Sequence, residues 1–415
     1  MKQFIKMFFA LNLALTFFLW CGCKQEVKTL RVGMWDQNQA PGIEKVLAEF
    51  TAKTGVKIQI EVTPWNDYWT LMEAAATGGS LPDVFWMHSG QVRRYMEAKL
   101  LMDLTDKIKS SKSAKMANFP ADLVNLFAYN GRQYAIPKDV DTIALWYNKK
   151  LFNKAGVPYP TNDWTWNDLK KAAIKLTDHS KGQYGIAFTP GETQTGYWNL
   201  IYQNNGFIID NSAKKSGFDS PGTIEAMEFI ESLLKEGCAV PLSYAEGDLM
   251  ALMQGNVIAM GYYGSWMLSA MNNSSFFVQN CNAVMLPASV AGKRATMYNG
   301  LGWAATTTTK QPGNAWKLLE FLASEDTQRK LSEYGVAISA FKGTAAPFTG
   351  KFPHFNVAAY TDQMPYAVLR PFSKNTGAWE DMSVRVLNEM WAGKKTASAA
   401  CLEIARNMNA MLAAE

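Results

Sequence analysis

Apolar and polar positions near residue 30 follow the repeat of a strand. Between Leu30 and Met34 every second residue is apolar, and from Ile43 to Phe50 the apolar residues change to helical spacing. Gly55 stands where that helix would end, because glycine adopts the left-handed conformation of a C-cap without strain. Strict alternation returns from Val56 to Val62. This order predicts a strand, a helix and a second strand, the start of an α/β sheet domain.

The same succession of elements continues along the chain. Residues Pro64 to Thr77 predict a helix that ends at two glycines, and Leu81 to Trp86 predict a short apolar strand. Helical spacing then predominates from Ile224 to Leu234, after Pro312, and from Leu402 to Leu412. We therefore predict an α/β fold whose later part is richer in helix.

Length and composition narrow the class of protein. The chain has 415 residues, which at roughly 100 to 200 residues per domain favours two compact units. Its residues are 48% apolar and 19% charged, as in a globular protein that buries large cores. No repeat or low-complexity linker separates the two units, so short structured crossings should join them.

The first residues predict an export signal. Lys2 and Lys6 precede an apolar run from Phe8 to Trp20, which is shorter than the roughly 20 residues that span a bilayer. The run ends in Leu-Trp-Cys-Gly-Cys, which resembles a bacterial lipoprotein signal except for its tryptophan. We predict a signal peptide over residues 1–22 and lipidation of Cys23, which would hold the exported chain on the membrane, facing the periplasm or exterior. Plain secretion with cleavage nearby is the alternative.

The remaining cysteines and charges exclude two further classes. Three cysteines without Cys-x-x-Cys spacing predict buried free thiols, with one disulfide as the alternative; they are Cys238, Cys281 and Cys401. The net charge of +5 falls to +3 without Lys2 and Lys6, and no basic stripe is present. We therefore expect no disulfide framework and no nucleic-acid partner. No later window reaches 18 consecutive apolar residues, so the lipid would be the one membrane contact.

Six groups of short motifs, in a fixed order, resemble a known family. They are LPDVFW at 81–86, YAIP with LWYNK within 134–149, FDSP at 218–221, AM with GSW within 259–266, NGLGW at 299–303, and AWK with FL within 315–322. Each motif alone is weak, whereas the series follows a lipoprotein-like signal and covers essentially the whole exported chain. Together they resemble the extracellular solute-binding proteins of ATP-binding-cassette sugar importers, the maltose-binding-protein-like group.

The resemblance implies a type II periplasmic-binding-protein fold of the α/β class. Each of two lobes would be a mixed sheet flanked by helices, with the ligand cleft between the lobes. Lobe one would comprise residues 23–138 and 296–340, and lobe two residues 139–295 and 341–415, so that closure is a hinge motion. The implied function is capture of a carbohydrate by a monomer, without cofactor or metal, and its delivery to the permease subunits of the importer.

Fourteen tryptophans suit a sugar site, because flat aromatic rings pack against the C–H faces of a sugar ring. Position in the predicted elements separates ligand-facing candidates from core residues. The candidates at strand ends and after glycine-containing turns are Trp35, Trp86, Trp266 and Trp303. The resemblance implies stacking positions at Trp198, Trp266 and Trp379. Tryptophans within patterned strands or helices are assigned to the core, and these are Trp146, Trp316 and Trp391.

Sugar hydroxyls require carboxylate or amide partners. The resemblance places an acidic sugar contact at Asp141, in the first crossing between lobes, with Asp139 as the near alternative. Further candidates lie in predicted loops after strands or beside a glycine, and they are Asp36, Asn38, His88 and Asn299. The family often has an acidic-basic pair near His88, whereas Ser-Gly-Gln follows it here. That departure counts against a maltodextrin as the ligand.

Two other classes of function compete with sugar capture. A glycoside-processing enzyme would need only paired carboxylates, but the three histidines lack metal spacing and no nucleophile or phosphate-loop motif is present. A binding protein of the same fold for another solute is the second alternative. Tyr262 and Tyr263 are the candidates for iron, and Arg294 and Arg370 for a phosphate ester such as glycerol phosphate. We favour carbohydrate binding without catalysis.

Overall fold

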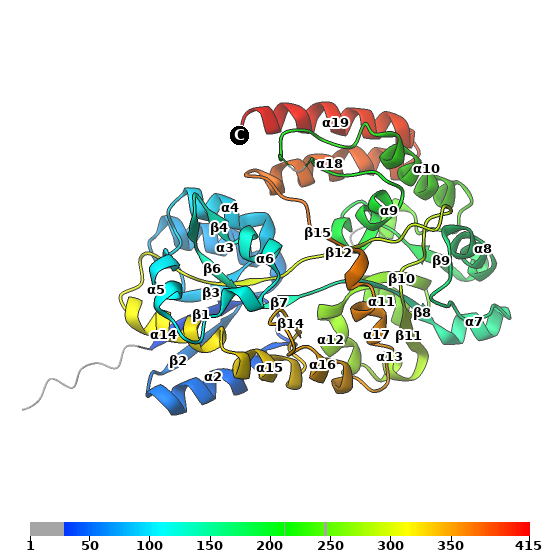
Figure 1. Ribbon diagram of the computed structural model, residues 1–415. Coiled ribbons are helices and arrows are strands. Elements are labelled where there is room, and N and C mark those ends of the chain that lie inside the picture. The colour runs from blue at the N-terminus through cyan, green and yellow to red at the C-terminus, as the bar shows by residue number, and fades with distance from the viewer. Residues whose placement is uncertain (1–28, 211, 245–246) are drawn as a thin grey trace, which may run out of the picture.

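A computed structural model describes residues 29–210, 212–244 and 247–415. Two groups of helices and strands, each built around its own sheet, lie side by side and are joined by several crossing segments (Figure 1). We call them the first lobe, around the five-stranded sheet, and the second lobe, around the four-stranded sheet. The predicted signal at residues 1–22 and the predicted lipidation site Cys23 lie outside the described residues.

The first lobe contains a mixed sheet with strand order β2-β1-β3-β13-β6. Strands β1, β2 and β3 are parallel, whereas β13 is antiparallel to both β3 and β6. Its strands are β1 Leu30–Met34, β2 Ile58–Val62, β3 Val84–Met87, β6 Ala135–Pro137 and β13 Gly302–Ala305. The helices that accompany them are α2 Ala40–Thr54, α3 Trp65–Thr77, α4 Ser89–Glu97, α5 Thr105–Ser110, α6 Ala121–Leu126, α14 Pro312–Leu322 and α15 Glu325–Glu333.

The predicted βαβ start is confirmed. Gly55 ends α2 with φ of 72°, the left-handed conformation that its position predicted. The strand predicted at Leu81 to Trp86 is displaced, since β3 begins at Val84 and runs to Met87. The reason is local: Pro82 has no N–H to donate to a ladder, and the Asp83 carboxylate accepts a hydrogen bond from the Arg31 backbone N–H.

The second lobe contains a sheet with strand order β11-β8-β10-β9. Strand β8 is antiparallel to β10 and β11, and β9 is parallel to β10. Side chains of β8 alternate between two cores, with Ala144 and Trp146 in one and Ile143 and Leu145 in the other. Helices therefore cover both faces of this sheet, and every residue of β8 is buried.

The remaining elements are short or belong to the second lobe. Its strands are β8 Ile143–Asn148, β9 Tyr184–Ala187, β10 Ile258–Gly264 and β11 Cys281–Val284. Its helices are α7 Lys149–Ala155, α8 Trp166–Leu176, α9 Trp198–Gln203, α10 Pro221–Lys235, α11 Leu249–Gln254, α12 Leu268–Asn272, α13 Ser275–Asn280, α16 Ala346–Lys351, α17 Ala358–Thr361, α18 Thr376–Trp391 and α19 Ala397–Ala413. Of these, α16 packs beside α15 and α17 packs beside β8. Single helical turns occur at η1 Met116–Asn118, η2 His179–Lys181, η3 Thr193–Tyr197, η4 Leu242–Tyr244, η5 Ser265–Met267 and η6 Met364–Tyr366. A two-residue hairpin joins β4 Ala128–Tyr129 to β5 Arg132–Gln133.

The crossing segments pair with one another between the lobes. Strand β7, Asp139–Val140, connects β6 to β8 and is antiparallel to β14, Ile338–Ser339. Just beyond it, Asp141 forms a β-bridge with Asn299 of the next crossing. Strand β12, Thr296–Tyr298, pairs in parallel with β15, Ala367–Leu369. These pairings bring four distant parts of the chain, residues 139–141, 296–299, 338–339 and 367–369, together at the junction of the lobes.

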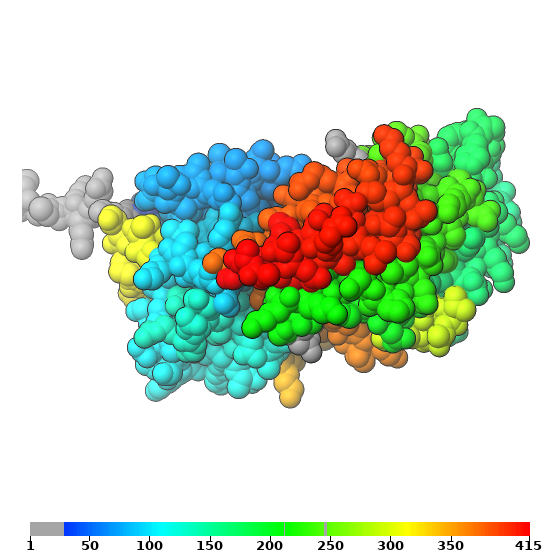
Figure 2. Space-filling view, turned by 90° about the horizontal axis from the view of Figure 1, so that it is seen from above, coloured from blue at the N-terminus to red at the C-terminus, as the bar shows by residue number. Residues whose placement is uncertain are grey.

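The C-terminal helices add a further contact between the lobes. Helix α18 of the second lobe packs against α4 of the first, and Lys374, which precedes α18, forms an ion pair with Glu97 at 2.9 Å. Figure 2 shows α19, in red, running across the upper face of the molecule, where it adjoins the cyan surface of the first lobe and the green surface of the second. The lobes therefore meet at this face as well as along the crossings.

Two findings bear on the cysteines and on membrane spans. Cys238, Cys281 and Cys401 are free and buried, as predicted. Burial raises the pKa of the Cys281 and Cys401 thiols to about 12, so both remain protonated and unreactive. Within the described part of the chain, no helix combines the length and the apolar character needed to cross a bilayer.

Candidate functional site

Three parallel strands of the first lobe each place an aromatic residue at their carboxyl ends. Trp35 follows β1, Trp65 follows β2 and begins α3, and His88 follows β3. The Trp65 ring centroid lies 5.2 Å from that of Trp35 and 5.2 Å from that of His88, with edge-to-face angles of 66° and 68°. Parallel strands deliver their following residues to one edge of the sheet, which explains the convergence of residues distant in sequence.

The convergence continues into the interior of the lobe. Trp35 makes edge-to-face contacts with Tyr68 at 5.0 Å and with Trp86 at 5.1 Å, and Trp65 lies 6.1 Å from Trp69. We call Trp35, Trp65, Tyr68, Trp69 and His88 the first-lobe aromatic cluster. Trp65 is 45% exposed, whereas Tyr68 is buried. Contacts with the other rings of the cluster therefore hold Trp65 in a fixed position at the surface.

His88 connects this cluster to the second crossing. Its Nδ1 accepts a hydrogen bond from the Gly90 N–H at 3.2 Å, capping α4, and its Nε2 lies 3.1 Å from the side-chain amide of Asn299. Burial, and secondarily the charge of Arg370, hold the pKa of His88 well below its usual value. A neutral ring whose Nδ1 accepts must carry its proton on Nε2. The recorded partner of Nε2 is Asn299 Nδ2; because Nε2 must donate, we assign the amide turned by 180°, with its oxygen toward His88 and its NH₂ group the other way.

Asp141 occupies the first crossing, as the resemblance implied. Its Oδ1 accepts hydrogen bonds from the Gln194 side chain at 2.7 Å and from the Asn299 backbone N–H at 3.2 Å. Burial raises the pKa of Asp141 to about 8, with a further contribution from Asp139. The carboxyl is therefore largely neutral at pH 7, and Oδ2 is its remaining oxygen for a further partner.

The neighbouring Asp139 is already paired. Its Oδ2 accepts a hydrogen bond from the fully buried Lys138 Nζ at 2.5 Å, and its Oδ1 accepts one from the Leu301 backbone N–H. Lys138 Nζ also donates to Gln39 Oε1 at 3.1 Å and lies 4.2 Å from the centre of the Trp86 ring. These contacts fix the crossing to the first lobe. Of the two predicted carboxylates, Asp141 is therefore the better placed for a ligand.

The other polar candidates divide into two kinds. Asp36 holds its own loop, because one oxygen accepts from the Asn38 and Gln39 backbone N–H groups and the other from the Gln39 side chain. Arg294 donates to the backbone carbonyls of Leu286 and Asn162, which leaves it in a surface loop of the second lobe. Among the described residues, neither side chain is hydrogen-bonded to a member of the aromatic cluster, although Asp36 directly follows Trp35.

Trp198 and Trp379 lie together in the second lobe and are covered. Their rings are 5.9 Å apart at an angle of 31°, and they are 1% and 0% exposed. Arg370 covers the Trp198 ring, with its guanidinium carbon 5.2 Å from the ring centre, and donates to the Glu380 carboxylate. Trp379 Nε1 donates to Ser373 Oγ at 3.0 Å. In this arrangement neither ring presents a free face.

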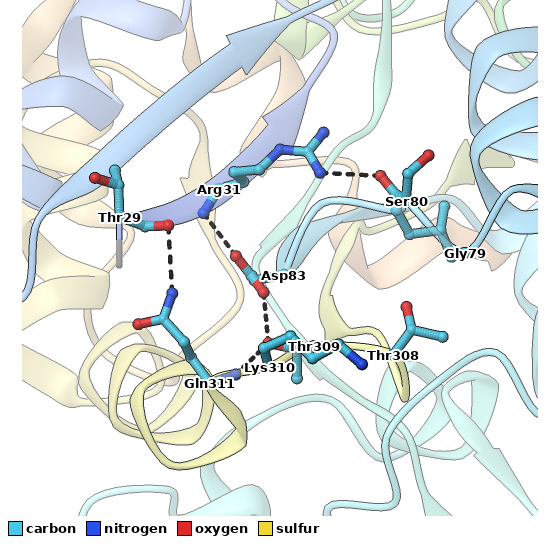
Figure 3. A pocket seen from close by; sticks show the side chains of 10 residues that line it. Thr29, Arg31, Gly79, Ser80, Asp83, Thr308, Thr309, Lys310 and Gln311 are labelled. Carbon is cyan, nitrogen blue, oxygen red and sulfur yellow. Dashed lines mark hydrogen bonds between the residues drawn. The ribbon is translucent and has the colours of Figure 1, made fainter. Parts of the chain in front are cut away.

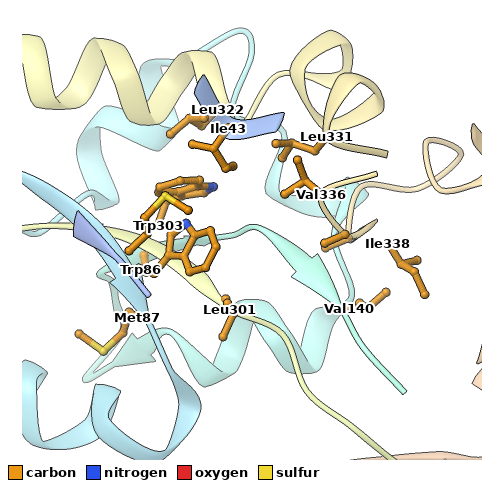
Figure 4. Packing of buried hydrophobic residues seen from close by; sticks show 14 of the residues in the cluster. Ile43, Trp86, Met87, Val140, Leu301, Trp303, Leu322, Leu331, Val336 and Ile338 are labelled. Carbon is orange, nitrogen blue, oxygen red and sulfur yellow. The ribbon is translucent and has the colours of Figure 1, made fainter. Parts of the chain in front are cut away.

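The placement predicted for Trp86 and Trp303 in their elements is wrong. Both lie inside strands, β3 and β13, and not after a strand or a turn. They are directly paired in the antiparallel ladder, with ring centroids 5.9 Å apart, and both are fully buried (Figure 4). The structure therefore places these two indoles in the core of the first lobe, among Ile43, Leu322 and Val336.

Trp266 lies in the turn η5, directly after β10. Its ring folds back over Gly264, where an added Cβ atom would lie 2.1 Å from the ring, so a glycine is required there. The ring is partly buried against the second-lobe core, and the preceding Ser265 N–H donates to Thr142 O in the first crossing at 3.1 Å. Trp266 thus lies next to the junction of the lobes. The core positions predicted for Trp146 and Trp391 are confirmed, and Trp316 is partly buried.

A cavity of about 480 Å³ lies elsewhere in the first lobe, at the amino ends of β1 and β3 (Figure 3). Its lining contains none of the predicted site residues, and includes Arg31, Ser80, Asp83, Thr309 and Gln311. These polar groups are largely bonded to one another: Asp83 accepts from Arg31 and Thr309, and Arg31 donates to the carbonyl of Ser80. The polar groups of this cavity are therefore largely bonded to one another, and we assign no function to the cavity.

The sequence reasoning missed Trp65 and Gln194. Trp65 could have been found by the rule that selected Trp35, because it also follows a predicted strand after only two residues. Gln194 had no comparable signal, since it lies in the irregular turn η3 and reaches Asp141 only through the tertiary fold. The tyrosines considered for iron are buried, and Tyr263 donates to the carbonyl of Leu249. The described residues contain no group of three metal-ligating side chains.

Comparison with known proteins relates this arrangement to a family. The chain is 22% identical over 391 residues to a putative binding protein of Brucella abortus, covering 92% of each chain, and 24% identical to a galactooligosaccharide-binding protein of Bacillus subtilis, covering 78% of this chain and 75% of that one. It superposes on an ABC substrate-binding protein of Listeria monocytogenes in complex with cycloalternan with a TM-score of 0.85 at 23% identity, covering 93% and 99% of the two chains.

The structural likeness confirms the two-lobed α/β fold that the sequence motifs implied. A model of the bacterial extracellular solute-binding protein family matches residues 36–329, a span that contains every strand of the second sheet and every strand of the first except β1. Because this match covers well over half of the sequence, the chain belongs to the bacterial extracellular solute-binding proteins.

Proposed function

We propose that this protein captures a carbohydrate between its lobes and delivers it to an ATP-binding-cassette importer. The observation that carries the proposal is the surface position of Trp65, whose ring stands on Trp35 and His88 at the carboxyl edge of the first sheet. An exposed ring held rigidly by other rings binds the C–H face of a sugar at little cost in conformational entropy. The named ligands of two relatives, galactooligosaccharide and cycloalternan, are both carbohydrates.

Polar groups for sugar hydroxyls lie beside this ring. His88 links the cluster to the Asn299 amide, and the Asn299 backbone donates to Asp141, so a ligand over Trp65 would meet amide and carboxyl groups in sequence. Asp141 Oδ2 can donate a hydrogen bond when the carboxyl is protonated and can accept one when it is ionised. A sugar hydroxyl both donates and accepts, so it can pair with Oδ2 in either state. The combination of one flat apolar surface with neighbouring bidirectional hydrogen-bonding groups supports a sugar over a purely apolar solute.

Titration of the protein with carbohydrates tests the proposal. Galactooligosaccharides, cycloalternan, maltose and simple aldoses are added while tryptophan fluorescence and the thermal midpoint are recorded. At least one carbohydrate should raise the midpoint and change the fluorescence. Trp65→Ala should weaken that binding about tenfold, because stacking contributes on the order of 1 kcal/mol or more. Leu71→Ala is the matched control, since Leu71 is exposed on the same helix α3 and is not itself a member of the cluster. Absence of any carbohydrate response would overturn the assignment.

We propose that binding occurs without catalysis. The family and the relatives reported above are binding proteins, which supports this choice. Incubation of the protein with galactooligosaccharide should leave the chain length of the sugar unchanged over hours, as judged by chromatography. Release of reducing sugar that Asp141→Asn abolishes would contradict a binding-only role.

We further propose that the exported chain is anchored through Cys23 and acts as a monomer. The proposal rests on the signal-like residues 1–22 and on the extracellular character of the family. Expression with a labelled fatty acid should mark the wild type and Cys21→Ala but not Cys23→Ala. Release of unlabelled wild-type protein into the medium would contradict the anchor and leave the sugar site untouched.

The lobes are proposed to hinge at the three crossings, with one lobe formed by residues 23–138 and 296–340 and the other by 139–295 and 341–415. Support comes from β7 and β14, which pair where two of these boundaries meet, and from the bridge between Asp141 and Asn299. Addition of a bound sugar should then reduce the radius of gyration in solution scattering, because the lobes close around it.

A further inference from the structure

One buried cation at the junction of the lobes is only partly paired. Arg370 is 5% exposed, donates through Nη2 to the Glu380 carboxylate, and covers the ring of Trp198. A Cβ atom added to Gly90, at the start of α4 in the first lobe, would lie 3.2 Å from Nη1. Nη1 itself has no hydrogen-bond partner among residues 29–210, 212–244 and 247–415. A buried N–H of a cation left without an acceptor is costly, so its position points to a partner from outside the chain.

Asn299 supplies a second donor at the same junction. Its side chain is 1% exposed, and one terminal atom has no partner within the described part of the chain. With the amide turned so that its oxygen faces His88, the terminal position without a partner, recorded as Oδ1, holds the nitrogen, which can only donate. Arg370 also acts on His88 electrostatically, which places the guanidinium near this ring. Two buried donors near His88 thus lack an acceptor within the described part of the chain.

The charges around Arg370 are already balanced. Glu380 neutralises the guanidinium from α18 and has Asp381 beside it, and Lys138 is neutralised by Asp139 in the crossing. His88 faces Arg370 from the first lobe as a neutral ring, and Lys374 is paired with Glu97 at the adjoining contact. A ligand carboxylate or phosphate at Nη1 would therefore bring a second negative charge next to Glu380 in a region from which water is excluded.

We propose that Glu380 determines the specificity of the site: by pairing with Arg370 it converts a buried cation into a donor for an uncharged oxygen, so that the site selects neutral, hydroxyl-bearing ligands over the corresponding acids and phosphate esters. The inference rests on the proposed capture of a carbohydrate. Opening of the lobes exposes Nη1 and the Asn299 amide, and a hydroxyl or ring oxygen of the sugar then accepts from both on closure. Glu380 acts through Arg370 and is not itself required to touch the sugar.

Matched pairs of neutral and acidic compounds test this selectivity. Isothermal titration calorimetry compares galactose with galacturonate, galactobiose with digalacturonate, glucose with glucuronate, and glycerol with glycerol 3-phosphate. In the wild type, the neutral member of every pair that binds should bind at least about tenfold more tightly than its acidic counterpart. Glu380→Gln should lower the ratio of neutral to acidic affinity about tenfold, because it leaves the guanidinium charge uncompensated while preserving the size of the side chain.

Glu389→Gln is the control, because Glu389 lies on the same helix but pairs with Lys395, away from the first lobe. It should leave the ratio of neutral to acidic binding unchanged. If the wild type binds the acids as tightly as the neutral compounds or more tightly, the inference about Glu380 is wrong, although capture of a sugar still stands. The inference is also wrong if folded Glu380→Gln keeps the wild-type ratio of neutral to acidic affinity. Should that variant fail to fold, the wild-type ratio decides. Failure of every sugar, neutral or acidic, to bind would instead overturn the proposed function.

Discussion

The first-lobe aromatic cluster and the Trp198–Trp379 pair of the second lobe use tryptophan in opposite ways. In the first lobe, edge-to-face contacts with Trp35 and His88 leave Trp65 45% exposed. In the second lobe, Arg370 lies over Trp198, and Trp379 is enclosed and donates to Ser373. The same residue type thus provides a surface in one lobe and a core in the other. What separates the two roles is the neighbour that covers the ring.

Removal of the enclosed ring should have the largest effect. Trp379→Ala should lower the free energy of unfolding by about 3–5 kcal/mol, because it leaves a large cavity beside Trp198 in the second-lobe core. Urea denaturation followed by circular dichroism measures this loss, and Trp391→Ala in the same helix is a control for general core damage. If Trp379→Ala kept its stability and lost sugar binding, the comparison between the lobes would be wrong.

The second largest effect should come from Asp141, which lies in the crossing between the two aromatic groups, and it should appear as a pH dependence of the stability of the protein. Asp141 has a pKa of about 8 in the folded protein, well above its value in an unfolded chain. As pH rises from about 4 to 8, the unfolded chain loses this proton while the native state retains it, so stability falls. Asp141→Asn removes this dependence and should be more stable than the wild type by up to a few kcal/mol at pH 8, but by little at pH 4.

Thermal unfolding across this pH range measures the difference. Asn can still accept from Gln194 and from the Asn299 N–H, so the variant keeps the hydrogen bonds of Oδ1. A stability gap that is constant between pH 4 and pH 8 would show that the Asp141 carboxyl is not the buried group inferred here. Asp36→Asn serves as the comparison, because the Asp36 carboxylate accepts hydrogen bonds from its own loop and not from Gln194 or the Asn299 N–H, which hold Asp141.

A conservative change at the exposed ring should have a smaller effect. Trp65→Phe keeps an aromatic face and should weaken sugar binding by only about threefold, with unfolding free energy unchanged within about 0.5 kcal/mol. Calorimetric titration with a bound carbohydrate measures the first quantity and urea denaturation the second. Equal losses for Trp65→Phe and Trp65→Ala would mean that the indole N–H, and not the ring face, makes the contact.

The weakest expected effect concerns the outer contact between the lobes. Glu97→Gln removes the ion pairs of this carboxylate with Lys374 and with Arg93 of the same helix, which are partly exposed and therefore contribute about 0–1 kcal/mol each. Sugar affinity should fall less than about fivefold, and the difference should vanish at high salt because exposed charges are screened. An effect that persists at 1 M salt would indicate that Glu97 acts through packing of α4 on α18.

Regular elements were predictable where local sequence specifies them. The period of apolar residues and the positions of Gly55 and Pro312 define β1, α2 and α14 without any tertiary information. The motif series also implied the two-lobed fold that the structural likeness confirms. The start of β3 moved past Pro82 and Asp83 because Pro82 has no N–H for a ladder and the Asp83 carboxylate accepts a hydrogen bond from the Arg31 backbone N–H.

The candidate site was less predictable because exposure depends on packing between distant segments. Nothing near Trp379 in the sequence indicates that Ser373 will bond its indole or that Arg370 will lie over Trp198. Trp86 and Trp303 become neighbours only when β13 inserts beside β3. By contrast, Trp35, Trp65 and His88 follow three parallel strands, and a rule about strand ends brings all three together.

The position of β13 in the first sheet has a consequence for how the chain acquires its structure. This strand lies between β3 and β6, yet along the chain it comes after every strand of the second sheet. Until β13 has been synthesised, the edges of β3 and β6 that it will occupy have no partner strand, and the first lobe cannot complete its core. Such long-range pairing delays folding, because a long loop must close before the contacts form. The export proposed above would benefit from that delay, because the chain would still be unfolded as it crosses the membrane.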